Sequence, residues 1–276
     1  MAGICLDYIF ISGTDSGGMS TTEKFANQTA SVSKLLFWQS AVILMNIIII
    51  GAGVVSGIER IVRLLMPMLF VLMIVMVLNS IINGDFARGL SFLFAPNFSD
   101  VTPATFLSAM GQAFFSLSLG MGSIMCYGAY MPKDQKVVPT SFTVASLDTL
   151  VAVLAGLAIF PIIFAFNLEP NSGPGLVFVS MLSAFNQMQF GQLIGPIFFI
   201  LLSIAALSSS ISLLEPGVAF LSEEGYLSRK NSALAISLFA WSLGIGTALS
   251  FNTLSGFELI SGKNFLDSLD FIANQI

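Results

Sequence analysis

Charged residues are scarce in this sequence, and histidine is absent. Only 9% of the 276 residues are charged, whereas about a quarter are charged in an ordinary soluble domain. So little charge excludes a water-soluble enzyme and a disordered tail. The net charge of −5 gives none of the basic surface that binds nucleic acid, so no nucleic-acid partner is expected. Without histidine, the commonest general base and metal ligand is missing. Two distant cysteines, Cys5 and Cys126, form no disulfide framework or metal-finger spacing.

Long apolar runs are abundant instead. Hydrophobic residues make up 55% of the chain, with 26 phenylalanines and a mean hydropathy of +0.91. A membrane-spanning helix needs about 20 apolar residues. Stretches of this kind cover residues 35–53, 61–82, 106–130, 142–166, 193–221 and 233–251. We therefore expect an all-α membrane protein, with residues 1–276 forming one transmembrane domain.

Cationic residues indicate the orientation of these spans, because cytoplasmic loops carry an excess of lysine and arginine. Alternate loops hold them, whereas the loop 167–192 has none. We therefore expect the loops at 54–60, 131–141 and 222–232 to face the cytoplasm.

Two acidic residues, Asp148 and Glu215, lie inside apolar spans. An acid at the centre of a membrane helix costs roughly 2.5–3.5 kcal/mol on insertion scales, so each is a candidate functional residue. Asp148 predicts ion or proton binding, and the alternative is a structural hydrogen bond to a neighbouring helix. Glu215 lies nearer a cytoplasmic end and precedes Pro216. It would either be solvated there or serve as an inner gate.

The third span is predicted to be broken at its centre by the sequence FFSLSLGMGS, residues 114–123. Glycines and serines weaken a helix, and broken helices at membrane depth occur where they line a cavity or are buried in protein. The helix ends that a break exposes suit small ions and zwitterionic substrates. Close helix packing through small residues is the alternative.

A serine cluster marks the fifth span, with hydroxyls at Ser208, Ser209, Ser210 and Ser212. Hard cations prefer oxygen ligands of this kind, although such serines can also bond to their own helix backbone. Taken with the internal acid and the helix break, the cluster predicts a cation-coupled transporter rather than an enzyme.

Several segments, in this order, resemble bacterial sodium:neurotransmitter symporters, which have the leucine-transporter fold. The segments are GIERIVRLLMP (57–67), GLSFLFAPNFSDVTPATFLSAMGQAFFSLSLGMGSIMCYGAYMPK (89–133), SLDTLVAVLAGLAIFP (146–161), GPGLVFV (173–179) and ALSSSISLLEP (206–216). The resemblance implies a partial leucine-transporter fold, from the end of its third helix to the start of its tenth. It contains six complete transmembrane helices, the third of them discontinuous. The implied function is sodium-coupled symport of an amino acid across the inner (cytoplasmic) membrane by alternating access, with no enzymatic activity.

The resemblance also implies ion sites. Ser116 and Asp148 correspond to the first sodium site, and Gln112 corresponds to the adjacent anion site. A second sodium site corresponds to Ala205, Ser208 and Ser209. Since Asp148 supplies a carboxylate and the family's extra acidic position is Ala152, we expect sodium to be the coupling ion and chloride not to be required. No other cofactor is implied.

Substrate and gate residues follow from the same resemblance. The substrate pocket corresponds to Phe115, Ser116, Ser118, Met121, Ser209 and Leu213. Apolar walls and an adaptable methionine favour a hydrophobic or aromatic amino acid. The cytoplasmic gate corresponds to Tyr130, Glu215 and Glu223, with a gate arginine that would precede residue 1.

The resemblance places two helices of the fold before residue 1, which leaves three alternatives to transport by this chain. It could be a truncated fragment that does not transport. It could be a half-transporter that needs a separately encoded N-terminal piece. It could also bind substrate in a sodium-dependent way without translocating it.

Overall fold

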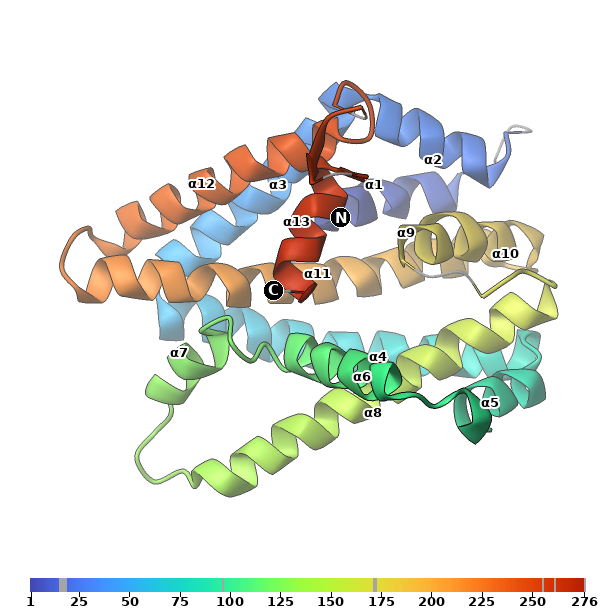
Figure 1. The fold of residues 1–276 in the computed structure, drawn as a ribbon, viewed down its shortest axis with the longest axis horizontal. Helices are drawn as coiled ribbons and strands as arrows, with labels where there is room; N and C mark the ends of the chain where they lie inside the picture. Colours follow the sequence, from blue (N-terminus) through green and yellow to red (C-terminus); the bar gives the residue numbers. More distant parts are fainter. Residues whose placement is uncertain (15–18, 96, 171–172, 255, 261, 276) are drawn as a thin grey trace. The chain divides into compact units, whose positions relative to one another are not determined.

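The computed structural model describes residues 1–276 except 15–18, 96, 171–172, 255, 261 and 276, and the described part is almost wholly helical (Figure 1). The elements, in chain order, are α1 (Ala2–Gly13), α2 (Thr21–Ala30), α3 (Val32–Gly51), η1 (Val54–Glu59), α4 (Arg60–Asn83), α5 (Phe86–Phe94), η2 (Phe98–Asp100), α6 (Pro103–Ser116), α7 (Ser123–Ala129), α8 (Val137–Ala165), α9 (Gly173–Gly175), η3 (Leu176–Ser180), α10 (Met181–Gln187), α11 (Gly191–Glu223), α12 (Arg229–Leu249), β1 (Glu258–Ile260), β2 (Lys263–Asn264) and α13 (Phe265–Gln275). β1 and β2 form a short antiparallel hairpin.

Helices occupy all the predicted spans. Five helical segments of the described chain are long and apolar enough to cross a membrane, at Val32–Gly51, Val54–Asn83, Val137–Ala165, Gly191–Glu223 and Arg229–Leu249. The remaining predicted span, 106–130, consists of two shorter helices, α6 and α7. The chain is thus an all-α membrane protein whose third span is discontinuous, as its central glycines and serines predict.

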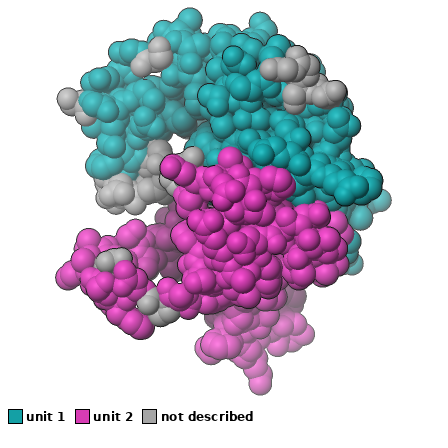
Figure 2. Space-filling model, turned by 90° about the vertical axis from the view of Figure 1, so that its right-hand side faces the viewer, with its two compact units in different colours: residues 1–72, 171–276 teal, residues 73–170 magenta. Residues whose placement is uncertain are grey.

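The chain divides into two compact units, coloured separately in Figure 2. Unit 1 comprises residues 1–72 and 171–276, and unit 2 comprises residues 73–170. Helix α4 contributes its first half to unit 1 and its second half to unit 2.

Unit 1 is built on α1, α3, α11 and α12, which pack against one another. Its core is rich in aromatic side chains: the Tyr8 ring centroid lies 4.8 Å from that of Phe178 and 5.0 Å from that of Phe199. Aromatic pairs at these separations add to the stability gained from burial alone. Phe199 thus anchors one side of the long helix α11 in this core.

Unit 2 contains a close contact between α5 and α8. The backbone N–H of Asp85 donates to the carbonyl of Pro161 at 2.9 Å. Gly89 packs so tightly against Pro161 that a Cβ atom at residue 89 would lie 2.5 Å from the proline Cγ. Arg88 stacks over the ring of Phe164 at 4.7 Å. Only glycine fits at position 89, and this contact fixes α8 within its unit.

Candidate functional site

The interruption between α6 and α7 is stabilised by left-handed backbone conformations. Ser118, Gly120 and Gly122 have φ angles of 54°, 83° and 82°. Glycine adopts such angles without steric cost, whereas they are unfavourable for most other residues. The backbone N–H of Leu119 donates to the carbonyl of Phe114 at 2.8 Å, which closes the end of α6. The break is therefore an ordered feature that begins directly after Ser116.

Ser116 and Asp148 come together in unit 2 although they are 32 residues apart. The Ser116 hydroxyl lies 2.7 and 2.8 Å from the two carboxylate oxygens of Asp148, to which it donates. Ser116 is the last residue of α6, and Asp148 lies in the first half of α8. A carboxylate and a hydroxyl at the end of a broken helix form an oxygen-rich site that suits a hard cation. This contact is also the hydrogen bond to a neighbouring helix that the sequence left open as the alternative role of Asp148.

The other predicted residues of unit 2 lie on or after α6. Gln112 is exposed one turn before Ser116, and the Phe115 side chain is 48% exposed. Ser118 and Met121 are half-buried within the break, and Tyr130 is half-buried at the C-terminal end of α7. No side chain of α6 is buried in the described part of the chain.

The predicted residues of unit 1 lie on α11. The Ser208 hydroxyl donates to the carbonyl of Ala205 at 2.9 Å, so two of the three predicted sodium ligands are adjacent. Ser209 is exposed, and the Leu213 side chain is 53% exposed. Predicted ligands therefore occur in both units, each set with its own short oxygen–oxygen contact.

Glu215 forms a buried ion pair. Its side chain is 0% exposed, and the Arg229 Nη2 atom lies 2.8 Å from each carboxylate oxygen. The Arg229 Nε–H also donates to the carbonyl of Ile50 at 3.1 Å, so this arginine links α3, α11 and α12. Of the two roles expected for Glu215, solvation is wrong, because the carboxylate is fully buried. Glu223 is exposed at the C-terminal end of α11.

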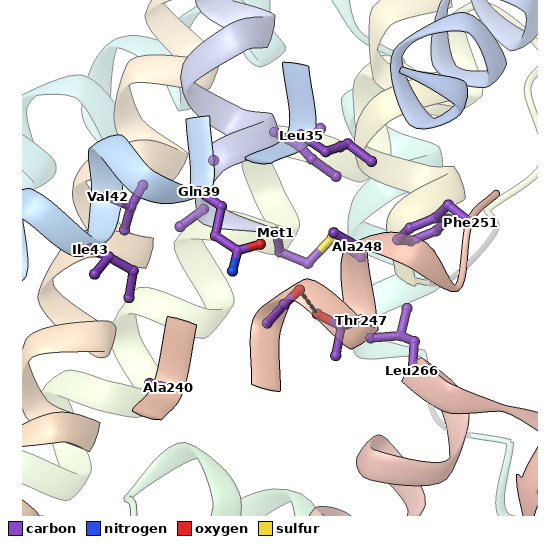
Figure 3. Close-up of a pocket in the computed structure, with 14 residues that line it drawn as sticks. Met1, Leu35, Gln39, Val42, Ile43, Ala240, Thr247, Ala248, Phe251 and Leu266 are labelled. Atoms are coloured by element: carbon purple, nitrogen blue, oxygen red, sulfur yellow. Dashed lines mark hydrogen bonds between the residues drawn. The ribbon is translucent and has the colours of Figure 1, made fainter. Parts of the chain in front are cut away.

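A cavity of about 230 Å³ lies in unit 1 among α1, α3, α12 and α13 (Figure 3). Its lining is mostly apolar, with the amide of Gln39 and the hydroxyl of Thr247 as polar groups. Thr247 donates to the carbonyl of Gly244 at 2.8 Å, and Gln39 donates to the carbonyl of Trp241 at 2.9 Å. None of the predicted substrate-binding residues lines this cavity, so it is distinct from the predicted pocket.

The contacts of two polar residues were not predicted from the sequence. Arg229 was assigned only to a cytoplasmic loop, yet it pairs with Glu215. Asn46 is fully buried in α3 and accepts a hydrogen bond from Ser210 of α11 at 3.0 Å. An asparagine inside the apolar run VILMNIIII was the signal, since polar residues at membrane depth are costly and usually have a role.

Comparisons with known proteins identify the family. The model of the sodium:neurotransmitter symporter family matches residues 22–263. The chain belongs to this family. It is 34% identical over 274 residues to YhdH, an uncharacterised sodium-dependent transporter of Bacillus subtilis, covering 97% of this chain and 60% of YhdH. It is 35% identical over 243 residues to an uncharacterised sodium-dependent transporter of Haemophilus influenzae, covering 88% of this chain and 53% of that protein.

A solved structure has the same fold. The crystal structure of MhsT in complex with L-phenylalanine matches with a TM-score of 0.89 and 42% sequence identity, covering 99% of this chain and 63% of MhsT. As a sodium:neurotransmitter symporter family member with apolar helices, the chain is a multi-pass protein of the cytoplasmic membrane. This is a family of symporters and not of enzymes. The chain spans between 53% and 63% of the length of these relatives.

Proposed function

We propose that this chain acts in the sodium-coupled symport of a hydrophobic or aromatic amino acid by alternating access. The observation that carries the proposal is the contact between Ser116 and Asp148 at the broken helix, in a chain that belongs to a sodium symporter family. A ligand shifts a conformational equilibrium only by its differential affinity for the two states. Sodium bound at this contact would favour the state in which the broken helix closes over the substrate.

Oxygen chemistry supports the proposed sodium ligands. Asp148 and Ser116 would form the first site, with Gln112 next to it, because a carboxylate and a hydroxyl lie within 2.8 Å of each other. The carbonyl of Ala205 with the hydroxyls of Ser208 and Ser209 would form the second site. Sodium would compete with the present Ser116 hydrogen bond, so the hydroxyl would turn its lone pairs toward the ion. These oxygens match what a hard cation prefers.

Phe115, Ser118, Met121 and Leu213 would contact the substrate, and Ser116 and Ser209 would contact both substrate and ion. The exposed apolar surfaces of Phe115 and Leu213 support an apolar side chain in the substrate. The complex of the related MhsT with L-phenylalanine supports the same class. In the gate, Tyr130, Glu215 and Glu223 would lie on the cytoplasmic side.

Chloride independence is part of the proposal. The Asp148 carboxylate provides a fixed negative charge next to the first sodium position, and residue 152 is alanine. A bound anion would therefore add repulsion rather than balance charge. Sodium-driven uptake that stops when gluconate replaces chloride would contradict this part.

Uptake into membrane vesicles tests the proposal. Under an inward sodium gradient, we expect accumulation of labelled phenylalanine or leucine, but not of glutamate or lysine. Asp148→Ala should abolish uptake, while Asp134→Ala, which removes an exposed loop acid, should not change it. Equal uptake in sodium and in potassium would contradict sodium coupling.

A second candidate is a half-transporter that assembles with a separately encoded N-terminal piece. It is favoured by α6, on which no side chain is buried although Gln112 and Ser116 are polar. Polar side chains at membrane depth usually face protein or water rather than lipid. Uptake that appears only on co-expression of that piece would support this candidate. Saturable binding without uptake would indicate a binding protein, and failure to accumulate in membranes would indicate a non-transporting fragment.

A further inference from the structure

The side chain of Asn46 forms a polar link within the apolar helix α3. It is 0% exposed. Its amide Nδ2 donates to the carbonyl of Val42 at 3.0 Å, one turn earlier in the same helix. Its Oδ1 lies 3.0 Å from the Ser210 hydroxyl, which donates to it and, at 2.8 Å, also to the carbonyl of Leu207 in its own helix. Burial of an amide without partners is costly, and both polar atoms of Asn46 have a partner, one of them on α11.

Ser210 is next in sequence to the proposed sodium ligands. A helix turns by about 100° per residue. The side chain of Ser210 points toward α3, and this direction also sets where the side chains of Ser208 and Ser209 point. Ser208 already lies against the carbonyl of Ala205 at 2.9 Å. The bond from Ser210 to Asn46 thus favours one rotation of the turn of α11 that carries these serines.

Neighbouring polar contacts of α3 are made to α12 instead. Gln39, on the same helix as Asn46, donates to the carbonyl of Trp241 at 2.9 Å (its side chain is drawn in Figure 3). The Trp241 indole N–H donates to the Ser40 hydroxyl at 3.0 Å. These bonds join α3 to α12 and make no contact with the serine cluster. Asn46 therefore differs from Gln39 in its partner helix and not in its chemistry.

We propose that Asn46 is a positioning residue for the sodium site on α11: through Ser210 it holds Ser208 and Ser209 in the orientation that binds the ion. The inference rests on the proposed sodium site of the preceding subsection. Asn46 does not contact the ion itself. Its removal allows the serine turn to rotate, which weakens sodium binding without removing a ligand.

Equilibrium binding of radioactive sodium to the purified protein tests this inference. Hydrogen bonds between membrane helices are worth little individually, so Asn46→Leu should raise the sodium concentration for half-saturation by roughly threefold to tenfold. Ser210→Ala removes the other partner and should give the same shift. The double variant should shift no further than either single variant. At saturating sodium, the amount of ion bound per protein should stay unchanged in all three.

Gln39→Leu is the matched control. It removes an amide of the same helix and a bond of similar length, so it should lower thermal stability about as much as Asn46→Leu but leave sodium half-saturation unchanged. If Asn46→Leu does not fold, Ser210→Ala alone decides the question, because it deletes a single hydroxyl.

Distinct results would overturn the two claims. Wild-type protein that binds no sodium saturably would contradict the proposed function, and the positioning role with it. Saturable wild-type binding with unchanged half-saturation in Ser210→Ala would contradict the positioning role alone. Equal shifts in Gln39→Leu and Asn46→Leu would mean that general loss of stability, rather than orientation of α11, explains the effect.

Discussion

The ion pair between Glu215 and Arg229 yields a prediction about which partner matters more for stability. The Glu215 side chain is fully buried, whereas the Arg229 side chain is 23% exposed and also bonds to the carbonyl of Ile50. Arg229→Met removes the arginine that pairs with a fully buried carboxylate. Glu215→Gln leaves an arginine that keeps one backbone partner and some contact with solvent. Loss of Arg229 should therefore cost much more than loss of the charge on Glu215.

Magnitudes follow from the geometry. With nitrogen–oxygen distances of 2.8 Å, the charge centres are close, and unit charges about 4 Å apart attract by about 4 kcal/mol at an effective dielectric constant near 20. Removal of one partner of a buried pair typically costs about 3–5 kcal/mol, which we expect for Arg229→Met. Glu215→Gln should cost about 1–2 kcal/mol, since the amide oxygen can still accept a hydrogen bond. Glu215→Leu with Arg229→Met should cost less than Arg229→Met alone, because no charge remains buried.

Thermal unfolding in detergent, followed by tryptophan fluorescence, measures these costs. Both tryptophans, Trp38 and Trp241, lie on α3 and α12, so their emission reports on the unit that contains the pair. Each kcal/mol shifts a midpoint by about 2–4 °C in a domain of 150–250 residues, so Arg229→Met should lower it by roughly 10 °C. A larger loss in Glu215→Gln than in Arg229→Met, or a double variant less stable than Arg229→Met, would refute the reasoning.

Two glycines give further predictions. Gly120→Ala should cost about 1–2 kcal/mol and reduce uptake, because its φ of 83° strains a Cβ atom although no other atom lies within 4 Å of that position. Gly111→Ala lies in the regular helix α6 with equally open space around it, so it should leave stability unchanged or raise it. Equal losses of stability and uptake in the two variants would contradict the role of the break. Gly89→Ala should lower the stability by about 1–3 kcal/mol, because the new Cβ atom clashes with Pro161. Gly128→Ala, where no atom lies within 4 Å of the new Cβ, should not lower it. Equal unfolding midpoints in the two variants would contradict tight packing between α5 and α8.

Much of the fold can be predicted from the sequence because membrane helices have a strong local signal. Apolar runs fix the spans at 35–53 and 233–251 to within a few residues of α3 and α12. The break in the third span also has a local cause, since Gly120 and Gly122 supply the left-handed angles. Short helices, such as those in residues 173–187, are less predictable, because packing against the rest of the chain decides where they begin and end.

The partners of the site residues could be predicted only in part. The resemblance assigned Ser116 and Asp148 to the same site, and the structure brings their side chains together. The resemblance gave no partner within the chain for Glu215. Arg229 is the first residue of α12, and its pairing with Glu215 depends on how α12 packs against α11, which no local sequence pattern predicts. Asn46 escaped for the same reason: its partner on α11 is 164 residues away.

The central claim is that sodium and an apolar amino acid bind to this protein in a coupled way through Asp148. The most direct test is equilibrium binding of labelled phenylalanine in sodium and in potassium, with the reciprocal titration of sodium at fixed phenylalanine. Because coupling between two ligands is reciprocal, each should raise the affinity for the other by the same factor, and Asp148→Ala should abolish the effect. Phenylalanine affinity that is equal in sodium and potassium would contradict the account.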